Sequence, residues 1–161
     1  MIRQLSRSEL QIVHDLAHEI WPLVYSKMIS SEQMTFMLKW MYGLENLTAK
    51  FDQGSLFYTY QSDGLNIGYL HLEPVDAQLV KIQKVYVHPD HHGNGIGRDL
   101  LLFSEVTARQ TGHNTLELQV NRGNPAVKFY QRVGFSIVDE QDFDIGNGYF
   151  MNDYVMRKKV E

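Results

Sequence analysis

The sequence predicts an α+β fold, with helices flanking a mixed and mostly antiparallel β-sheet. Two amphipathic helical segments occupy the first third of the 161 residues. Short apolar segments typical of strands follow from Ser55 onward. One strand–helix–strand unit between Leu79 and Val120 requires a parallel crossover, whereas the short turns between the other strands favour antiparallel pairs.

The first third of the chain is predicted to hold a short strand and two main helices. Ile2–Leu5 is typical of an opening strand. Ser6 or Ser8 can cap the first helix, and Pro22 is expected to end or kink it because proline lacks a backbone N–H. Its apolar stripe consists of Ile12, Val13, Leu16, Ala17 and Ile20. A second helix is expected after Ser30-Ser31. Its stripe consists of Met34, Met37, Leu38, Met41 and Tyr42.

The middle of the chain is predicted to form a hairpin and a central strand. Glu45–Phe51 is expected to add one or two helical turns. Ser55–Gln61 and Ile67–Glu73 are expected to pair around Ser62-Asp63-Gly64, a turn of the Asp-Gly type. Leu79–His88 is then predicted to be the central strand.

The apolar pattern of the central strand changes phase along its length. Val80 and Ile82 are apolar in one phase, while Val85 and Val87 are apolar in the other. A slip of one residue is what a β-bulge produces. A bulged central strand is therefore predicted.

The remaining elements follow from turn residues and periodicity. A helix is predicted from residue 95 to 112, and Thr115–Val120 alternates like a half-buried strand. Phe135–Asp139 and Tyr149–Lys158 are predicted as closing strands around the turn Gly146-Asn147-Gly148.

A glycine-rich turn follows the central strand and opens a helix. Gly93, Gly95 and Gly97 let the backbone approach a ligand closely, and the free N–H groups of a helix N-terminus favour a phosphate. A Walker-type loop is excluded because no Gly-Lys-Ser/Thr ending is present. A dinucleotide fingerprint is disfavoured by its glycine spacing, although Glu117 stands near the position of the expected ribose-binding acid.

Two motifs in this region resemble those of the GNAT superfamily of acetyl-CoA-dependent N-acetyltransferases. His92-Gly93-Asn94-Gly95-Ile96-Gly97 resembles the family's pyrophosphate loop, Arg/Gln-x-x-Gly-x-Gly/Ala, with His92 in place of the usual first residue. Asn121–Phe135 is similar to the motif Asn-x-x-Ala-x-x-Phe-Tyr-x-x-x-Gly-Phe, with one asparagine shifted by a residue. The segment Gly146–Met156 also resembles the ending of members near the spermidine/spermine acetyltransferases. The predicted fold is thus GNAT-like.

The resemblance implies that acetyl-CoA is the co-substrate and that its binding residues lie in these motifs. The backbone of the central strand would stabilise the negative charge that develops on the thioester oxygen. The implied cofactor-binding residues are Val85, Tyr86, Val87, His92, Gly93, Asn94, Gly95, Ile96, Gly97, Arg98, Asn124, Ala126, Phe129 and Tyr130.

Two residues of the second motif have a structural interpretation beside the functional one. Tyr130 matches the family's tyrosine that protonates the departing thiolate, yet it shares an apolar stripe with Phe129 and Val133 that is typical of core residues. Asn124 would bind the pantetheine arm, or it only caps the helix that Pro125 begins.

The general base is not defined by the resemblance. Several relatives use an acid or a histidine on the central strand, where this chain has Lys81 and Gln83. Four other residues could act as the general base through a water molecule. These are Glu73, His71, Asp76 and Glu32. Glu73 is the preferred catalytic base among them.

Composition predicts one domain over residues 1–161, with 43% hydrophobic and 12% aromatic residues. The absence of cysteine excludes disulfides and thiolate metal sites, and His91-His92 has no matching ligand cluster, so no metal is expected. Without a membrane-length apolar run or a signal-like segment, a cytoplasmic protein with no membrane partner is expected. The net charge of −4 without a basic run argues against nucleic acid.

The predicted function is acetyl transfer from acetyl-CoA to a primary amine of a small molecule or peptide, with a polyamine as the specific hypothesis. Aromatic side chains for cation–π contact with a cationic acceptor would be Trp21, Tyr25, Trp40 and Tyr42, unless they are core residues. Acidic side chains to attract it would be Glu19, Glu32 and Glu45. The alternative is a non-catalytic acyl-CoA-binding or interaction domain of the same fold. A homodimer is expected from the family resemblance.

Overall fold

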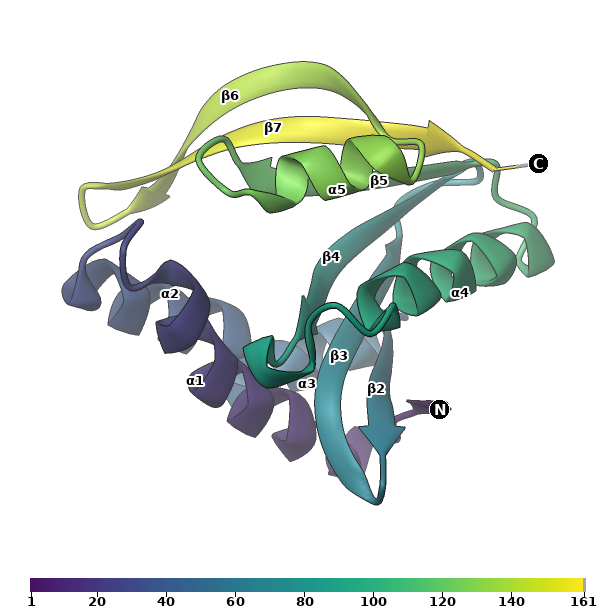
Figure 1. Ribbon diagram of the computed structural model, residues 1–161, viewed down its shortest axis with the longest axis horizontal. Helices are drawn as coiled ribbons and strands as arrows, with labels where there is room; N and C mark the ends of the chain where they lie inside the picture. The colour runs from purple at the N-terminus through teal and green to yellow at the C-terminus, as the bar shows by residue number, and fades with distance from the viewer. Residues whose placement is uncertain (161) are drawn as a thin grey trace. The chain divides into compact units, whose positions relative to one another are not determined.

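The computed structural model describes residues 1–160 and contains a seven-stranded sheet in the order β1-β2-β3-β4-β5-β7-β6. β4 and β5 are parallel, and the β1–β2, β2–β3, β5–β7 and β6–β7 pairs are antiparallel. The predicted α+β fold with a mixed, mostly antiparallel sheet is therefore confirmed. Along the chain (Figure 1) the elements are β1 (Ile2–Gln4), η1 (Arg7–Glu9), α1 (Gln11–Tyr25), α2 (Ser31–Tyr42), α3 (Leu44–Asp52), β2 (Leu56–Ser62), β3 (Leu65–Pro74), β4 (Leu79–Val87), η2 (Pro89–His91), α4 (Ile96–Gln110), β5 (Thr115–Asn121), α5 (Ala126–Arg132), β6 (Ser136–Gly146) and β7 (Tyr149–Lys159).

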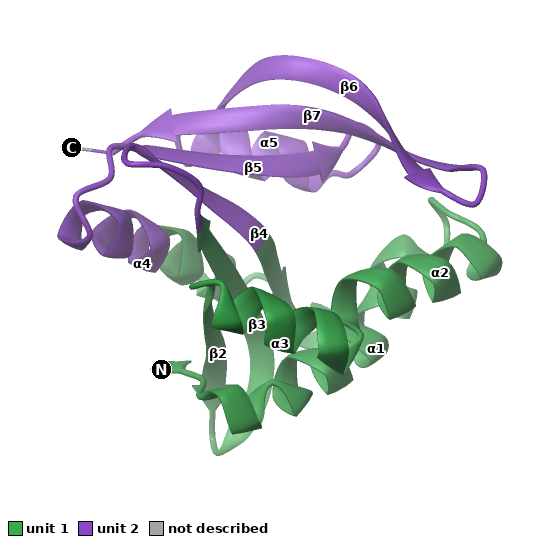
Figure 2. Ribbon diagram, turned by 180° about the vertical axis from the view of Figure 1, so that it is seen from behind, with its two compact units in different colours: residues 1–73, 84–101 green, residues 74–83, 102–161 purple. Residues whose placement is uncertain are grey.

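The chain divides into two compact units, coloured separately in Figure 2. Unit 1 contains residues 1–73 and 84–101, and unit 2 contains residues 74–83 and those from 102 onward. β4 and α4 each pass from one unit into the other, so each unit includes part of the sheet and part of α4. None of the helices within residues 1–160 is long and apolar enough to cross a membrane.

The first helix of unit 1 confirms the predicted apolar stripe but differs at both ends. Ser6 precedes the 3₁₀ turn η1 rather than α1, and its N–H donates to Glu9 Oε1 at 3.0 Å. α1 also continues through Pro22 to Tyr25, so the prediction that Pro22 ends the helix is wrong. Trp21, only 2% exposed, anchors this turn in the core, and such packing outweighs the hydrogen bond that proline cannot make.

The second helix follows its sequence signals closely. Ser30 caps α2, because its hydroxyl oxygen accepts a hydrogen bond from the N–H of Gln33 at 3.1 Å. Its buried residues are Met34, Met37, Leu38 and Tyr42. α3 covers the short helical segment predicted over Glu45–Phe51 and buries Leu47.

An aromatic cluster joins α1 and α2 to the strands of unit 1. Trp21 Nε1 donates to the hydroxyl of Tyr42 at 3.2 Å, and the Tyr42 and Tyr69 hydroxyls lie 2.7 Å apart. The Tyr25 and Tyr86 hydroxyls are paired at 2.6 Å. Burial raises the pKa values of Tyr42 and Tyr69 well above the ordinary value for a phenol, so both hydroxyls stay protonated as hydrogen-bond donors.

The predicted hairpin between β2 and β3 is confirmed. Asp63 and Gly64 both have positive φ, 52° and 77°, which are the conformations of a type I′ turn. The register between the two strands shifts between Tyr60 and Gln61. The bulge predicted in β4 stays a prediction.

The alternation of buried side chains along β4 continues further than the sequence pattern indicated, as far as Lys84. Val80, Ile82 and Lys84 are each no more than 5% exposed, so a lysine occupies the third buried position. Lys84 Nζ lies 3.1 Å from Nδ1 of His71 and 5.2 Å from the centroid of the Tyr42 ring. Part of the apparent change of phase therefore comes from a buried charged residue.

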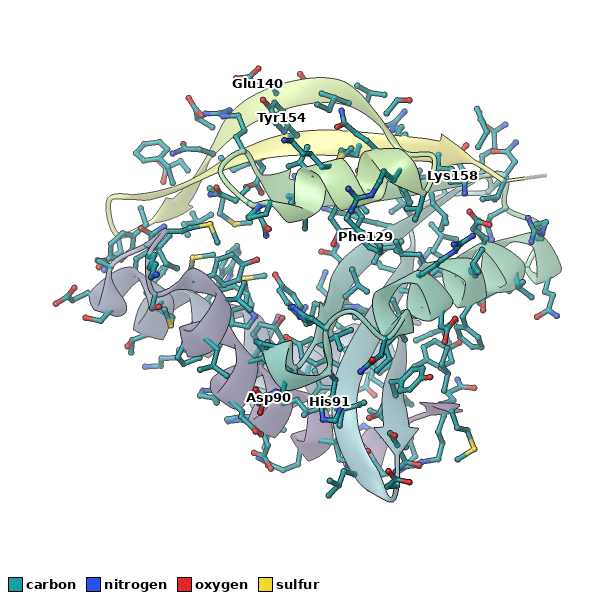
Figure 3. All side chains as sticks on the ribbon, viewed as in Figure 1. Asp90, His91, Phe129, Glu140, Tyr154 and Lys158 are labelled. Atoms are coloured by element: carbon teal, nitrogen blue, oxygen red, sulfur yellow. The ribbon has the colours of Figure 1, made fainter. Side chains whose placement is uncertain are left out.

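In unit 2, α5 lies over one face of β5 and β7. Lys158 Nζ of β7 donates to the carbonyl oxygen of Val133, just after α5, at 2.7 Å. Lys158 of β7 and Phe129 of α5 are both labelled in Figure 3. Gly134, with φ +104°, ends the helix as predicted.

The closing hairpin is longer than predicted, since β6 continues from Ser136 to Gly146 rather than ending at Asp139. β6 is at the end of the strand order and almost all its residues are exposed, so its charged residues are tolerated without burial. Glu140 and Tyr154 lie opposite each other on β6 and β7 (Figure 3). The predicted turn at Gly146-Asn147-Gly148 is present, and Asn147 and Gly148 both have positive φ.

The buried hydroxyl of Tyr42 is expected to be a major polar contributor to the stability of unit 1. Tyr42→Phe removes the acceptor for Trp21 and the partner of Tyr69 without changing ring packing. A loss of about 1–3 kcal/mol in the free energy of unfolding is expected by denaturant titration. Tyr60→Phe is the matched control, because the Tyr60 hydroxyl makes only an exposed 3.4 Å contact with Asp99. Equal stability of the two variants would contradict this role of Tyr42.

Candidate functional site

The glycine turn after β4 is an exposed loop that ends at a helix N-terminus. Gly93 and Gly95 have φ of +84° and +77°, the region that glycine adopts without strain. Side-chain atoms added at either glycine would meet no atom within 4 Å, so the backbone is open on that side. Ile96, 7% exposed, anchors the start of α4 in the core. The turn thus exposes backbone N–H groups at the positive end of a helix dipole, which is an anion-binding arrangement.

His92 closes this turn onto β4. Its Nε2 lies 2.8 Å from the carbonyl oxygen of Val87, so this ring nitrogen carries the proton and donates it. Arg98, in the first turn of α4, is exposed. His92, which replaces the usual first residue of the loop motif, therefore supplies a hydrogen bond within the loop. Arg98 is a cation able to approach a bound anion.

His88 fixes the start of the loop to α1. Its Nδ1 accepts a hydrogen bond from the N–H of Asp90 at 3.1 Å, which leaves the proton on Nε2. Nε2 lies 3.1 Å from Glu19 Oε1. Asp90 and His91 form the 3₁₀ turn η2 that follows β4 (Figure 3). The loop is thus held by side chains on both of its flanks.

The expected oxyanion strand lies where β3 approaches β4 very closely. A side-chain carbon added at Gly68 would lie 2.8 Å from the Tyr86 carbonyl oxygen and 3.6 Å from the Val87 Cα. The N–H of His88 donates to Ile67 at 2.8 Å, which continues the contact of β3 with this end of β4. Only glycine at position 68 permits this approach.

β4 parts early from its other neighbour. The β4–β5 ladder covers Leu79–Ile82 opposite Thr115–Leu118, although β4 continues to Val87 and β5 to Asn121. The later residues of both strands therefore lie outside this ladder.

The second motif lies in unit 2 and positions Asn124 and Tyr130. The side-chain oxygen of Asn124 accepts the N–H of Ala126 at 2.9 Å, so this residue caps α5 whatever else it binds. Tyr130 is partly exposed, and its ring centroid lies 6.1 Å from that of the buried Phe135 in a T-shaped arrangement. None of the residues of α5 is fully buried, which leaves both interpretations of Tyr130 open.

The four candidates for the general base have different surroundings. Glu73 is engaged with Lys50 at 3.2 Å. His71 is fully buried and stacked on Phe57, with ring centroids 4.2 Å apart. Asp76 accepts the N–H groups of the turn before β4, which lower the pKa of its carboxyl. Glu32 is exposed at the start of α2. Of these, only Glu73 and Glu32 keep a carboxylate that is not built into the backbone or the core.

The aromatic residues expected to contact a cationic acceptor differ in how far they are exposed to solvent. Trp21 and Tyr42 are 2% and 0% exposed, so these two are core residues rather than walls of a binding site. The cation placed over the Tyr42 ring is the chain's own Lys84. Trp40, by contrast, is 48% exposed on α2.

One buried acid was missed by reasoning from the sequence. Asp153 on β7 is 3% exposed, and burial raises the pKa of its carboxyl to about 6 against the opposing effects of Arg122 and Lys81. Its sequence signal is weak, namely an aspartate two positions from Val155 in the buried phase of a strand. No group of three or more histidine or acidic side chains within residues 1–160 is placed to hold a metal ion.

Comparisons with known proteins agree with the motifs. Residues 53–137 match the family described as acetyltransferase (GNAT) domain. Spermidine N(1)-acetyltransferase of Thermoplasma acidophilum is 26% identical over 99% of this chain and 97% of its own length. An uncharacterised N-acetyltransferase of Mycobacterium tuberculosis is 34% identical over 63% of this chain and 65% of its own length.

Solved structures of the same fold cover the whole described chain. The crystal structure of the PaiA N-acetyltransferase from Thermoplasma acidophilum in complex with coenzyme A has a TM-score of 0.83 at 26% identity, covering 99% of this chain and 98% of its own. A GCN5-related N-acetyltransferase structure from Rhodopseudomonas palustris has the same TM-score at 20% identity, covering 99% of this chain and 95% of its own, and supports the fold alone.

Proposed function

Because the chain belongs to the GNAT family of acetyltransferases, we propose that it transfers the acetyl group of acetyl-CoA to a primary amine of a polyamine. The observation that carries this proposal is the open glycine turn at the start of α4, whose sequence resembles the family's pyrophosphate loop. A spermidine acetyltransferase similar over nearly the whole chain supports the acceptor class. The non-catalytic alternative is not favoured, since the similar proteins are named as N-acetyltransferases.

The pyrophosphate of acetyl-CoA would bind the N–H groups from His92 to Arg98. The positive φ at Gly93 and Gly95 turns successive amides toward the open side of the loop. The α4 dipole and the exposed Arg98 add positive potential. In this proposal Asn94, Ile96 and Gly97 contribute backbone contacts only.

The thioester would lie against Val85, Tyr86 and Val87. Nucleophilic attack places negative charge on the acetyl oxygen, and a fixed backbone N–H at this strand would stabilise that charge. The close approach of β3 at Gly68 supports this proposal, because it packs the backbone of β3 directly against Tyr86 and Val87.

The residues of α5 would bind the pantetheine and provide the acid. Ala126 and Phe129 would contact the arm, and Asn124 would contact it with the capacity that its capping bond leaves. Tyr130 would give its phenolic proton to the departing thiolate, whose parent thiol has a pKa of about 8.5. Glu73 remains the base proposed from the sequence.

A polyamine acceptor agrees with the charge of the chain. Net charge is −4, and Glu32 and Glu45 are exposed on unit 1 helices, so a cation is attracted rather than repelled. The homodimer and the cytoplasmic location stay predictions. We also propose that both units form one domain, because β4 and α4 are each shared between them.

An acceptor screen tests the proposed function. Thiol release from acetyl-CoA is measured with spermidine, spermine, an amino sugar and a peptide N-terminus at low and high salt. Polyamines are expected to react fastest, and their advantage is expected to shrink at high salt because attraction between exposed charges is screened beyond about 10 Å at 0.1 M. Salt-insensitive activity on a neutral acceptor, with polyamines inert, would exclude the polyamine. Absence of thiol release with every amine would exclude the enzyme.

Gly95→Ala tests the pyrophosphate turn. A methyl group there stands on the open side of the loop, so the affinity for coenzyme A is expected to fall at least tenfold, about 1.4 kcal/mol by calorimetry. Gly64→Ala is a matched control, because Gly64 has the same φ of +77° and equally open surroundings in the β2–β3 turn. Both variants carry the same backbone strain, and only the first is expected to lose coenzyme A. Equal losses, or none, would contradict the assignment.

Tyr130→Phe tests the proposed acid. The ring contacts with Phe129 and Phe135 remain, so coenzyme A affinity is expected to be kept while kcat falls roughly 10²–10⁴-fold. Tyr154→Phe, which removes a hydroxyl from a partly exposed tyrosine on β7, is the control and is expected to keep kcat. An unchanged kcat in Tyr130→Phe at saturating substrates would make Tyr130 a packing residue.

A further inference from the structure

Unit 2 contains a cavity of about 430 Å³ at the edge of the sheet where β4, β5 and β6 begin and β7 ends. All of the residues that line it belong to unit 2. None of them is among the residues proposed to bind acetyl-CoA. The volume lies in the range of small-molecule sites, roughly 300–1,000 Å³. The cavity is therefore large enough for a second ligand.

The strand register brings polar side chains from three strands to this cavity. Thr115, the first residue of β5, is opposite Leu79 on β4 and opposite Lys159 on β7. Residues directly opposite each other in a ladder point to the same side of the sheet. Arg157 is two positions from Lys159 on β7, so it points to that side as well, and it is opposite Ser136 on β6. All five residues line the cavity.

Two cations of the cavity have hydrogen-bond donors to spare. Arg157 Nε donates to Glu117 Oε2 at 2.8 Å, and within residues 1–160 the two terminal NH₂ groups of this guanidinium make no hydrogen bond. Lys159 Nζ donates to the Thr115 hydroxyl at 3.2 Å and has no acidic partner in the same range. An arginine carries five N–H donors and a lysine three, and neither accepts. The cavity thus has an excess of donors.

The other charged side chains of the cavity are already engaged. Lys158 Nζ donates to the carbonyl oxygen of Val133 at 2.7 Å and is paired with Glu105. Asp76 Oδ1 accepts two backbone N–H groups of its own turn, each at 2.8 Å. Because Asp76 is an acid in the same lining, a ligand with two negative charges is disfavoured there. A single negative charge suits the cavity best.

The cavity also has apolar walls. Leu79 and Val138 both line it. The register of β6 against β7 shifts between Ile137 and Asp139, which leaves Val138 without an opposite residue, and this valine is 53% exposed. Exposed apolar surface next to donors favours a ligand that combines an anionic group with a hydrocarbon part.

We propose that this cavity binds a small monocarboxylate with an apolar body. The terminal NH₂ groups of Arg157 hold the carboxylate, since the planar guanidinium matches its two oxygens. Lys159 adds the second cation and the Ser136 hydroxyl a further donor. Leu79 and Val138 contact the hydrocarbon part. The site is distinct from the proposed acetyl-transfer residues and does not depend on that activity.

The test titrates the full-length protein by calorimetry with benzoate, benzyl alcohol and phenyl phosphate. Benzoate is expected to bind one site per chain with a Kd at or below about 1 mM, and about tenfold or more tightly than the other two. The alcohol lacks the charge, and the phosphate is mostly a dianion at neutral pH. The titrations are repeated with saturating coenzyme A, which is expected to leave benzoate binding unchanged. Gly95→Ala is likewise expected to bind benzoate as wild type does.

Two substitutions in the cavity identify the site. Lys159→Gln removes a charge whose partner is only a hydroxyl, and Arg157→Lys keeps a cation for Glu117 while removing the fork. Each is expected to weaken benzoate binding by about tenfold or more. The matched controls are Lys128→Gln and Arg109→Lys, which change exposed cations outside the cavity and are expected to bind as wild type does.

Four results would overturn the inference and leave the proposed acetyl transfer untouched. They are no benzoate binding, equal binding by the cavity variants and their controls, binding of phenyl phosphate as tight as that of benzoate, and loss of benzoate binding when coenzyme A is saturating. A wild type inactive on every amine of the acceptor screen would overturn only the proposed function, because benzoate binding requires no acetyl transfer.

Discussion

The architecture of this protein depends on how β4 is divided between its neighbours. Its ladder with β5 ends at Ile82, and the later part of the strand is held by β3, where Gly68 allows a close backbone approach. A strand that paired fully on both sides would have no N–H left for a ligand. The residues of β4 after Ile82 therefore lie outside the ladder with β5, and the glycine permits the close approach of β3 to this end of the strand.

Two buried ionisable groups are placed with opposite consequences. Lys84 enters the aromatic cluster of unit 1, where His71 and the ring of Tyr42 receive its ammonium group. Asp153 is held in unit 2 with its nearest cations already engaged, and its pKa is raised to about 6. The stability of a buried charge depends on the groups around it, and those around Asp153 offset its burial only in part.

Local signals predicted the elements and the glycine turn after β4 well, because they depend on residues close in sequence. The start of α2 at Ser30-Ser31, the Asp63-Gly64 turn and the tight turn at Gly93 and Gly95 are all of this kind. The errors involve long-range packing. Pro22 remains helical because of the buried Trp21 before it, and the extent of β6 depends on its pairing with β7. Asp153 was missed because its pKa depends on burial, which one sequence does not show.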